Sequence, residues 1–279
     1  MRFGIKTAPQ HTTWNAMLDV WRAADDIEIF ESAWNFDHFY PIFSDSTGPC
    51  LEGWTMLAAM AQATRRIRIG CQVTGMIYRH PAVLANMAAT IDIISNGRLE
   101  LGVGAGWNQE ECDAYGIPLP PLKERFDRFD EGVEALVLLL SQETSTFDGQ
   151  YVRLRDARCE PKAVQRPHPP IVIGGNGPNR TLRTVARFAQ HWNSISTAEQ
   201  WPAIKETLNE RCAEVGRDPA TIECSVMLRP DLTDGVGSLV DDAAAFAAAG
   251  ADIGIVYLPV PHTPSVLEPI AEALRPLTG

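Results

Sequence analysis

The chain has 279 residues, of which 24 are Lys or Arg and 35 are Asp or Glu, so its formal net charge is −11 and its sequence pI is near 5.0. Hydrophobic residues make up 45% and charged residues 21%, an ordinary globular composition that excludes disordered, collagen-like and coiled-coil proteins. A net anion of this size is poorly suited to nucleic acid or to an anionic membrane surface, so neither partner is expected. A local basic pocket for one anionic ligand is compatible with this charge.

The six cysteines form no CxxC pair and no metal-finger spacing, so we expect small buried hydrophobes or surface thiols and no metal site. The N-terminal residues, MRFGIK, begin like a strand and lack the parts of a signal peptide. No apolar run approaches the ~20 residues that a membrane helix needs. The sequence therefore predicts a soluble, cytoplasmic protein.

Short β-rich runs alternate with helical patterns along the chain. Eight strands are predicted at 2–7, 27–37, 67–73, 99–103, 170–173, 191–194, 222–227 and 252–257. Helices are predicted between them, from apolar residues at helical spacing, at 13–24, 53–64, 81–95, 124–140, 180–189, 198–215, 238–249 and 265–274.

This alternation predicts an α/β fold, a (β/α)8 TIM barrel, in one domain over residues 1–279. The strand cores are almost wholly apolar, as parallel strands buried on both faces should be. An open doubly wound sheet would show fewer strands or a dinucleotide motif in its first turn, and that turn (7–10) has no glycine. The polar stretch 141–169 is interpreted as a short insertion between helix 4 and strand 5, with a hairpin at Asp148 and Gly149.

In such a barrel, catalytic and binding groups come from the C-terminal ends of the strands and the loops that follow. Asp37 and His38 follow the second strand, and they can share one site only if the strand has already ended there, as Pro41 suggests. Histidine suits proton transfer near neutral pH. A core aspartate that holds the loop, with His38 packed beside it, is an equally good reading of these two residues.

Glycines mark the ends of the third and fourth strands. Gly75 follows the third, where a plain turn is the simpler explanation. One strand end carries glycines at alternate positions (Gly102, Gly104 and Gly106) and so lacks side chains there, which would let a flat ligand or another backbone approach. Close packing of the next helix is the alternative. Trp107 beside them would either stack on a ring or fill the core.

The strongest local signal follows the fifth strand, where a Gly-rich turn (174–177) leads through Pro178 and Asn179 to Arg180. Backbone N–H groups at the following helix start, together with Arg180, would bind a phosphate. The turn is neither a P-loop nor a GxGxxG motif, and a bare turn is the competing explanation. Hydrolase elbows and zinc motifs are absent, so the phosphate site, the flat surface and the His–Asp pair favour an enzyme with a bound ring cofactor.

With these motifs the chain resembles the bacterial luciferase-like superfamily of flavin and deazaflavin (coenzyme F420) barrels. The matching segments are FDHF at 36–39, VTG at 73–75, YRHPA at 78–82, SNGRLELGVGAGW at 95–107, ERFD at 124–127, and the run 171–178. The resemblance covers nearly the whole chain, and it implies a homodimeric barrel with its cofactor at the C-terminal mouth.

The resemblance also assigns roles. His38 would be the catalytic proton donor or substrate-polarising group, with Asp37 beside it over the ring, and Gln72–Val73 would be a non-proline cis peptide behind the ring. The implied cofactor contacts are Asp37, Gln72, Val73, Thr74, Gly75, Ala105, Gly106, Trp107, Gly175, Asn176, Gly177, Asn179 and Arg180. The last four of these would surround the phosphate, and Arg79, Arg180 or another cation would meet the γ-glutamyl tail.

Two departures bear on the substrate. The sugar-phosphate dehydrogenase branch has a Trp shortly after the His and a catalytic Glu after the fourth-strand glycines, and this chain has Ile42 and Trp107 there. Sugar-phosphate oxidation is therefore not expected. A small, fairly hydrophobic substrate is expected near Trp14, Ile42, Trp107 and the segment after Asp148.

The expected activity is hydride transfer between F420 and a small organic molecule, since the compact pattern around Trp107 looks more like the deazaflavin branch. The alternative is a two-component FMN monooxygenase, which would need a partner reductase. A third possibility, from another class, is an idle barrel that only binds cofactor.

Overall fold

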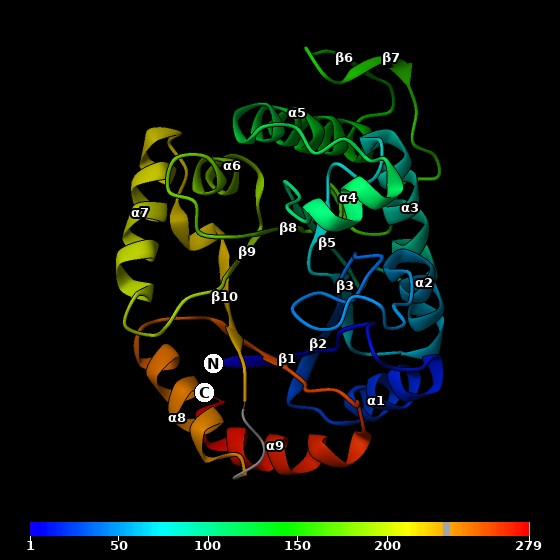
Figure 1. Ribbon diagram of the computed structural model, residues 1–279. Helices are drawn as coiled ribbons and strands as arrows, with labels where there is room; N and C mark the ends of the chain where they lie inside the picture. Colours follow the sequence, from blue (N-terminus) through cyan, green and yellow to red (C-terminus); the bar gives the residue numbers. More distant parts are fainter. Residues whose placement is uncertain (231–234, 279) are drawn as a thin grey trace.

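The computed structural model describes residues 1–230 and 235–278, and it has a closed barrel of eight parallel strands (Figure 1). In barrel order the strands are β1 (Arg2–Lys6), β2 (Phe30–Asn35), β3 (Arg68–Cys71), β5 (Leu99–Gly104), β8 (Ile171–Gly174), β9 (His191–Ser194), β10 (Glu223–Leu228) and β11 (Ile253–Tyr257). Pairing of β3 with β5 and of β11 with β1 closes the ring. The (β/α)8 prediction is confirmed, and each strand overlaps one predicted from the sequence.

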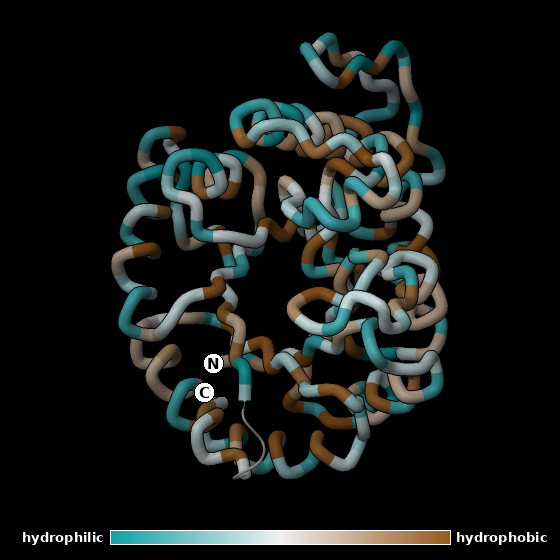
Figure 2. Tube along the Cα trace, viewed as in Figure 1, coloured by the Kyte–Doolittle hydropathy of each residue, from teal (hydrophilic) through white to brown (hydrophobic). Residues whose placement is uncertain are grey.

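An outer ring of helices covers the barrel (Figure 1). It consists of α1 (Trp14–Asp26), α2 (Gly53–Ala63), α3 (Pro81–Ile94), α5 (Leu122–Ser141), α6 (Thr181–Phe188), α7 (Trp201–Glu214), α8 (Gly237–Ala248) and α9 (Leu267–Leu274). Along these helices hydrophobic and hydrophilic stretches alternate (Figure 2), because each helix packs one face on the strands and leaves the other to solvent. None of the helices in the described ranges is long and apolar enough to cross a membrane.

Two elements lie outside this plan. A short helix, α4 (Gln109–Tyr115), follows β5 and was not predicted. The hairpin expected at Asp148 and Gly149 is present as β6 (Ser145–Asp148) and β7 (Arg153–Ala157), and it projects beyond α5 (Figure 1). The carboxylate of Glu131 on α5 accepts hydrogen bonds from the backbone N–H groups of the hairpin turn (150–152) and so holds the turn on the helix.

The third strand is interrupted where it reaches the mouth of the barrel. The peptide bond between Gln72 and Val73 is cis, as the resemblance implies, and the chain resumes as β4 (Thr74–Gly75), which pairs with β5. A Cβ atom on Gly102 would collide with the carbonyl oxygen of Cys71, and one on Gly104 would lie 2.8 Å from the side chain of Val73. These glycines of β5 therefore admit the backbone of the interrupted strand, one of the two approaches expected from their spacing.

Candidate active site

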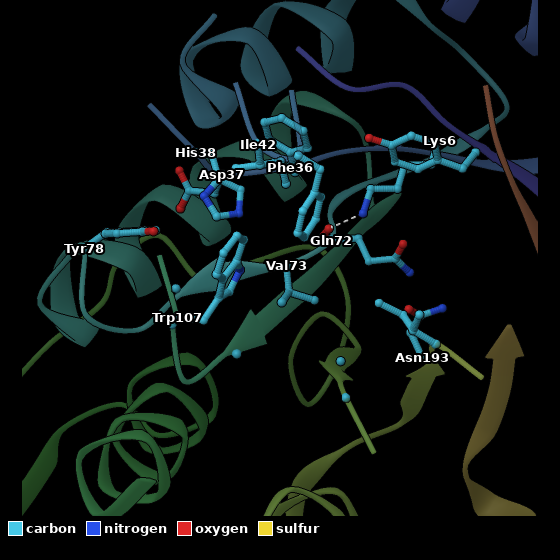
Figure 3. A pocket seen from close by; sticks show the side chains of 18 of the residues that line it. Lys6, Phe36, Asp37, His38, Ile42, Gln72, Val73, Tyr78, Trp107 and Asn193 are labelled. Carbon is cyan, nitrogen blue, oxygen red and sulfur yellow. Dashed lines mark hydrogen bonds between the residues drawn. The ribbon is translucent and has the colours of Figure 1, made fainter. Parts of the chain in front are cut away.

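A cavity of about 260 Å3 lies at the C-terminal ends of the strands (Figure 3). Its wall combines aromatic and aliphatic side chains, five glycines and a few polar groups. The lining residues are Lys6, Phe36, Asp37, His38, Ile42, Phe43, Gln72, Val73, Gly75, Tyr78, Gly104, Gly106, Trp107, Gly174, Gly175, Asn193, Ile195, Arg229 and Tyr257. An apolar wall with a few convergent polar groups is typical of a small-molecule site.

His38 is held on one side of this cavity by a buried carboxylate. Its Nδ1 lies 2.9 and 3.0 Å from the two carboxylate oxygens of Glu111, which is fully buried on α4. Because a carboxylate accepts hydrogen bonds, Nδ1 carries a proton and donates it to Glu111. The remaining ring nitrogen, Nε2, is therefore the atom of His38 that can give or take a proton.

Glu111 is surrounded by further donors. Its carboxylate accepts hydrogen bonds from the hydroxyl of Tyr78 at 2.9 Å and from the amide of Asn108 at 3.1 Å. Burial and the nearby Glu111 charge raise the pKa of Tyr78, so its hydroxyl stays protonated and serves as a donor. These hydrogen bonds stabilise the negative charge of Glu111, and that charge can in turn stabilise a positive charge on His38.

Asp37 is occupied by a different partner. Both oxygens of this fully buried carboxylate bind the guanidinium of Arg79, one of them at 3.0 Å, and Arg79 also donates to Glu52 at 2.7 Å. Burial raises the pKa of Asp37, and the ion pair with Arg79 opposes that shift. Arg79, expected as a possible contact for an anionic tail, is thus part of an ion-pair triad with the buried Asp37 and the partly exposed Glu52.

A polar wall faces His38 across the cavity (Figure 3). Lys6 at the end of β1 donates from Nζ to the backbone carbonyl of Gln72 at 2.7 Å, and burial lowers the pKa of Lys6 to about 8. The side-chain amide of Gln72 is buried, and neither its oxygen nor its nitrogen has a hydrogen-bond partner among the described residues. Such an amide is costly unless a ligand or water pairs with it.

Aromatic side chains form the rim. Trp107 and Phe43 are stacked with ring centroids 5.4 Å apart, and they are 49% and 82% exposed. Trp107 also meets the ring of His38 edge-on at 5.4 Å. Trp107 is therefore a rim residue of the cavity and does not fill the core.

Most of the residues expected at the site do line the cavity. These are Asp37, His38, Gln72, Val73, Gly75, Gly106, Trp107 and Gly175. Thr74 is fully buried just behind the wall, where its hydroxyl accepts a hydrogen bond from the indole of Trp54 at 2.7 Å. Ala105 lies between two lining residues, Gly104 and Gly106, and packs against the hydrophobic core.

The Gly-rich turn after β8 begins at the cavity and leads away from it. Gly175 has φ +116°, and Asn176 is tied to the next strand through the hydroxyl of Ser194 and the carbonyl of Ile195. Gly177 and Asn179 follow before α6. Arg180 donates to Asp127 at 2.7 Å and to Asp130 at 2.9 Å, both on α5, so its charge is already balanced. The phosphate assignment stays a prediction that rests on the backbone of this turn.

Part of the expected substrate region lies elsewhere. Trp14 lines a separate hollow against α2, and Tyr151, just after Asp148, lines another hollow beside α3 and α5.

Sequence reasoning missed four polar or aromatic residues of the cavity wall, although all four lie at or close to the C-terminal ends of strands: Lys6, Asn193, Arg229 and Tyr257. It also missed Glu111, which is 73 residues from His38 in the chain.

The closed barrel, with its cavity at the C-terminal ends of the strands, places this protein in the class of (β/α)8-barrel proteins that hold a ligand site at that end. The family model described as luciferase-like monooxygenase matches residues 1–263. The chain belongs to that family.

Several named proteins are similar to this chain. An F420-dependent glucose-6-phosphate dehydrogenase of Microbacterium testaceum is 30% identical over 239 residues, which cover 83% of this chain and 69% of the relative. An uncharacterised protein of Mycobacterium bovis is 33% identical over 183 residues, which cover 65% of this chain. The match spans 64% of that relative, just under two thirds of its length. The structure of an F420-dependent secondary alcohol dehydrogenase in complex with an F420-acetone adduct has a TM-score of 0.86 at 20% identity, covering 100% of this chain and 99% of that one. That likeness shows the shared fold.

Proposed function

We propose that this chain is an F420-dependent oxidoreductase that moves hydride between F420 and a small, fairly hydrophobic organic substrate. The observation that carries the proposal is His38, held by the buried Glu111 with its Nε2 as the only ring nitrogen left for proton exchange at the cavity. The similarity to an F420-dependent dehydrogenase supports the choice of cofactor.

The cavity wall fits a flat ring with a polar edge. Gly104, Gly106, Gly174 and Gly175 present backbone without side chains, which leaves room for a planar group. The unpartnered amide of Gln72 offers both a donor and an acceptor, as the edge of a pyrimidine-type ring requires. When bound, F420 would supply the carbon that accepts or releases hydride.

The protein residues would handle the proton that accompanies hydride transfer. In the direction of alcohol oxidation, Nε2 of His38 accepts the hydroxyl proton, and Glu111 balances the charge that the ring then carries. In the reverse direction the same nitrogen returns the proton to the carbonyl oxygen. Phe36, Ile42 and the Trp107–Phe43 pair would exclude water and hold an apolar substrate.

Titration of the purified protein with F420 and, separately, with FMN tests the proposal by fluorescence quenching. We expect micromolar or tighter binding of F420 and much weaker binding of FMN. Preference for FMN would instead support oxygen chemistry with a partner reductase, and binding of neither would exclude both functions.

The same titration tests the phosphate assignment with Gly177→Asp. The new carboxylate is expected to repel a phosphate and to weaken F420 binding by about ten-fold or more. Gly177→Ala is the matched control, because an added Cβ already lies 2.8 Å from the hydroxyl of Thr181 and only the aspartate adds charge. Equal affinities for the two variants would remove the phosphate from this turn.

We further propose that the protein is a homodimer whose subunits meet at α2 and α3. An apolar hollow of about 600 Å3 lies between these helices, with Val83 54% exposed and Ile94 40% exposed on its wall. Exposed apolar patches of this kind commonly mark an interface between subunits. Sedimentation equilibrium should give twice the chain mass of 30.7 kDa, and a monomer at micromolar concentration would contradict the proposal.

A further inference from the structure

A chain of hydrogen bonds runs through the barrel interior and ends at the cavity. Asn193 on β9 lines the cavity and donates from Nδ2 to the hydroxyl of Ser225, its neighbour on β10, at 2.9 Å. Behind Ser225, Nε2 of His191 lies 2.7 Å from the same oxygen, and Nδ1 of His191 lies 2.8 Å from Glu100. Ser225 and His191 are buried, so bulk water does not compete for these bonds.

The chemistry of Glu100 fixes the direction of every bond in this chain. Burial by itself would raise the pKa of Glu100, but hydrogen bonds and charges from His191 and Arg68 lower it to about 2. The carboxylate is therefore ionised and can only accept, so Nδ1 of His191 donates to it. When His191 is neutral, its Nε2 accepts a hydrogen bond from the Ser225 hydroxyl, and the Ser225 oxygen accepts one from the Asn193 amide.

The orientation of Asn193 in the structure is compatible with either charge state of His191. If His191 carries a second proton, Nε2 donates to Ser225, whose hydroxyl then turns to the backbone carbonyl of Trp192 at 3.4 Å. With the hydroxyl turned to Trp192, the Ser225 oxygen again accepts a hydrogen bond from the Asn193 amide. In this arrangement Nδ2 of Asn193 donates to Ser225 in both states, and Oδ1 is the amide atom left for the cavity.

We propose that Glu100, His191 and Ser225 are positioning residues that fix the Asn193 amide so that its oxygen accepts a hydrogen bond from an N–H group of the bound ligand. The donor rests on the proposed function, since the deazaflavin ring carries an imide N–H (N3) between two carbonyl groups. To bind this edge of the ring, the protein needs a hydrogen-bond acceptor for the N–H group and a hydrogen-bond donor on either side of it for the two carbonyl groups. Lys6 and Gln72, on the same side of the cavity as Asn193 (Figure 3), carry donor groups.

A Ser–His–Glu set also occurs in hydrolases, but this one cannot act as a nucleophile. Ser225 is fully buried and is not part of the cavity wall, so no substrate carbonyl reaches its hydroxyl. Its oxygen is, moreover, already bonded to Asn193 and His191. The set therefore acts through Asn193, which does reach the cavity.

The test compares F420 with its N3-methylated derivative in the purified protein. The unchanged protein should bind F420 about ten-fold or more tightly than the methylated form, because the methyl group removes the donor and leaves Oδ1 unpaired. Ser225→Ala should lose most of this discrimination, since nothing then holds the amide in one orientation. Ser225→Thr keeps the hydroxyl and should retain the discrimination.

A merely structural role for Ser225 would weaken both ligands equally and leave their ratio unchanged, and that result would overturn the proposal. Should Ser225→Ala not fold, Asn193→Ala must abolish the discrimination, and His191→Phe must reduce it. Binding of F420 with no discrimination in the unchanged protein would reject the positioning role alone.

If neither F420 nor FMN binds, the proposed function fails, and the side-chain amide of Asn193 is then observed directly by NMR. Its hydrogen exchange must quicken in Ser225→Ala but not in Ser225→Thr, and equal exchange rates would reject the positioning role.

Discussion

Replacing His38 with alanine is expected to lower turnover with F420 by about 100- to 10,000-fold while leaving F420 binding nearly unchanged. The loss would follow from the geometry, because Nε2 of His38 is the atom proposed to exchange the proton at the cavity and alanine offers none. Turnover is measured from the F420 absorbance with the alcohol or enone that screening identifies, and binding from fluorescence quenching. Turnover that survives the change would remove His38 from the reaction, and binding lost together with turnover would make it a structural residue.

Glu111→Gln is the matched control, because it changes the partner of His38 without touching the cavity wall. The amide keeps a hydrogen-bond acceptor for Nδ1 but removes the negative charge that stabilises a protonated ring. We expect a smaller loss of turnover than in His38→Ala and a pH profile displaced to lower pH for the step in which His38 donates its proton. An unshifted profile would mean that Glu111 only orients the ring.

The barrel was predictable from the sequence because its strands carry their own signal. Runs such as 171–173 are wholly buried in the barrel, and their apolar character needs no knowledge of the neighbours. The short helix α4 carries no such signal, because its seven residues, QEECDAY, have no apolar stripe. Glu111, one of its two buried residues, packs against His38 and Tyr78, which are distant in the chain. Missing α4 also meant missing Glu111, the partner of His38.

The candidate site was predicted in part, and the gaps have a physical cause. His38 and Gln72 follow strand ends that carry recognisable motifs, whereas Lys6, at the end of β1, and Asn193, one residue before the end of β9, are followed by no motif. Both nevertheless lie where barrel enzymes carry their functional groups, at the C-terminal ends of strands. The partners of Asp37 and Arg180 could not be found this way, because ion pairs between distant segments depend on how the helices and loops pack.

Removing the guanidinium of Arg79 is expected to have the largest effect on stability. Arg79→Leu leaves Asp37 buried without its partner, and breaking a buried ion pair in this way costs about 3–5 kcal/mol of unfolding free energy. Urea unfolding followed by tryptophan fluorescence measures the loss. A change below about 1 kcal/mol would mean that water or another cation reaches Asp37.

The pH dependence of that loss separates charge from packing. Burial already raises the pKa of Asp37, and without Arg79 the pKa rises further. A carboxyl group whose pKa is higher in the folded state binds more protons when folded, so stability falls as pH rises from the ordinary value of 3.8 through the raised one. The Arg79→Leu variant should therefore be least destabilised near pH 4 and most destabilised above the raised pKa of Asp37.

The double variant Asp37→Asn, Arg79→Leu has no buried charge at this position and should recover most of the lost unfolding free energy at pH 7. Equal destabilisation at both pH values, with no recovery in the double variant, would assign the effect to packing of the Arg79 side chain.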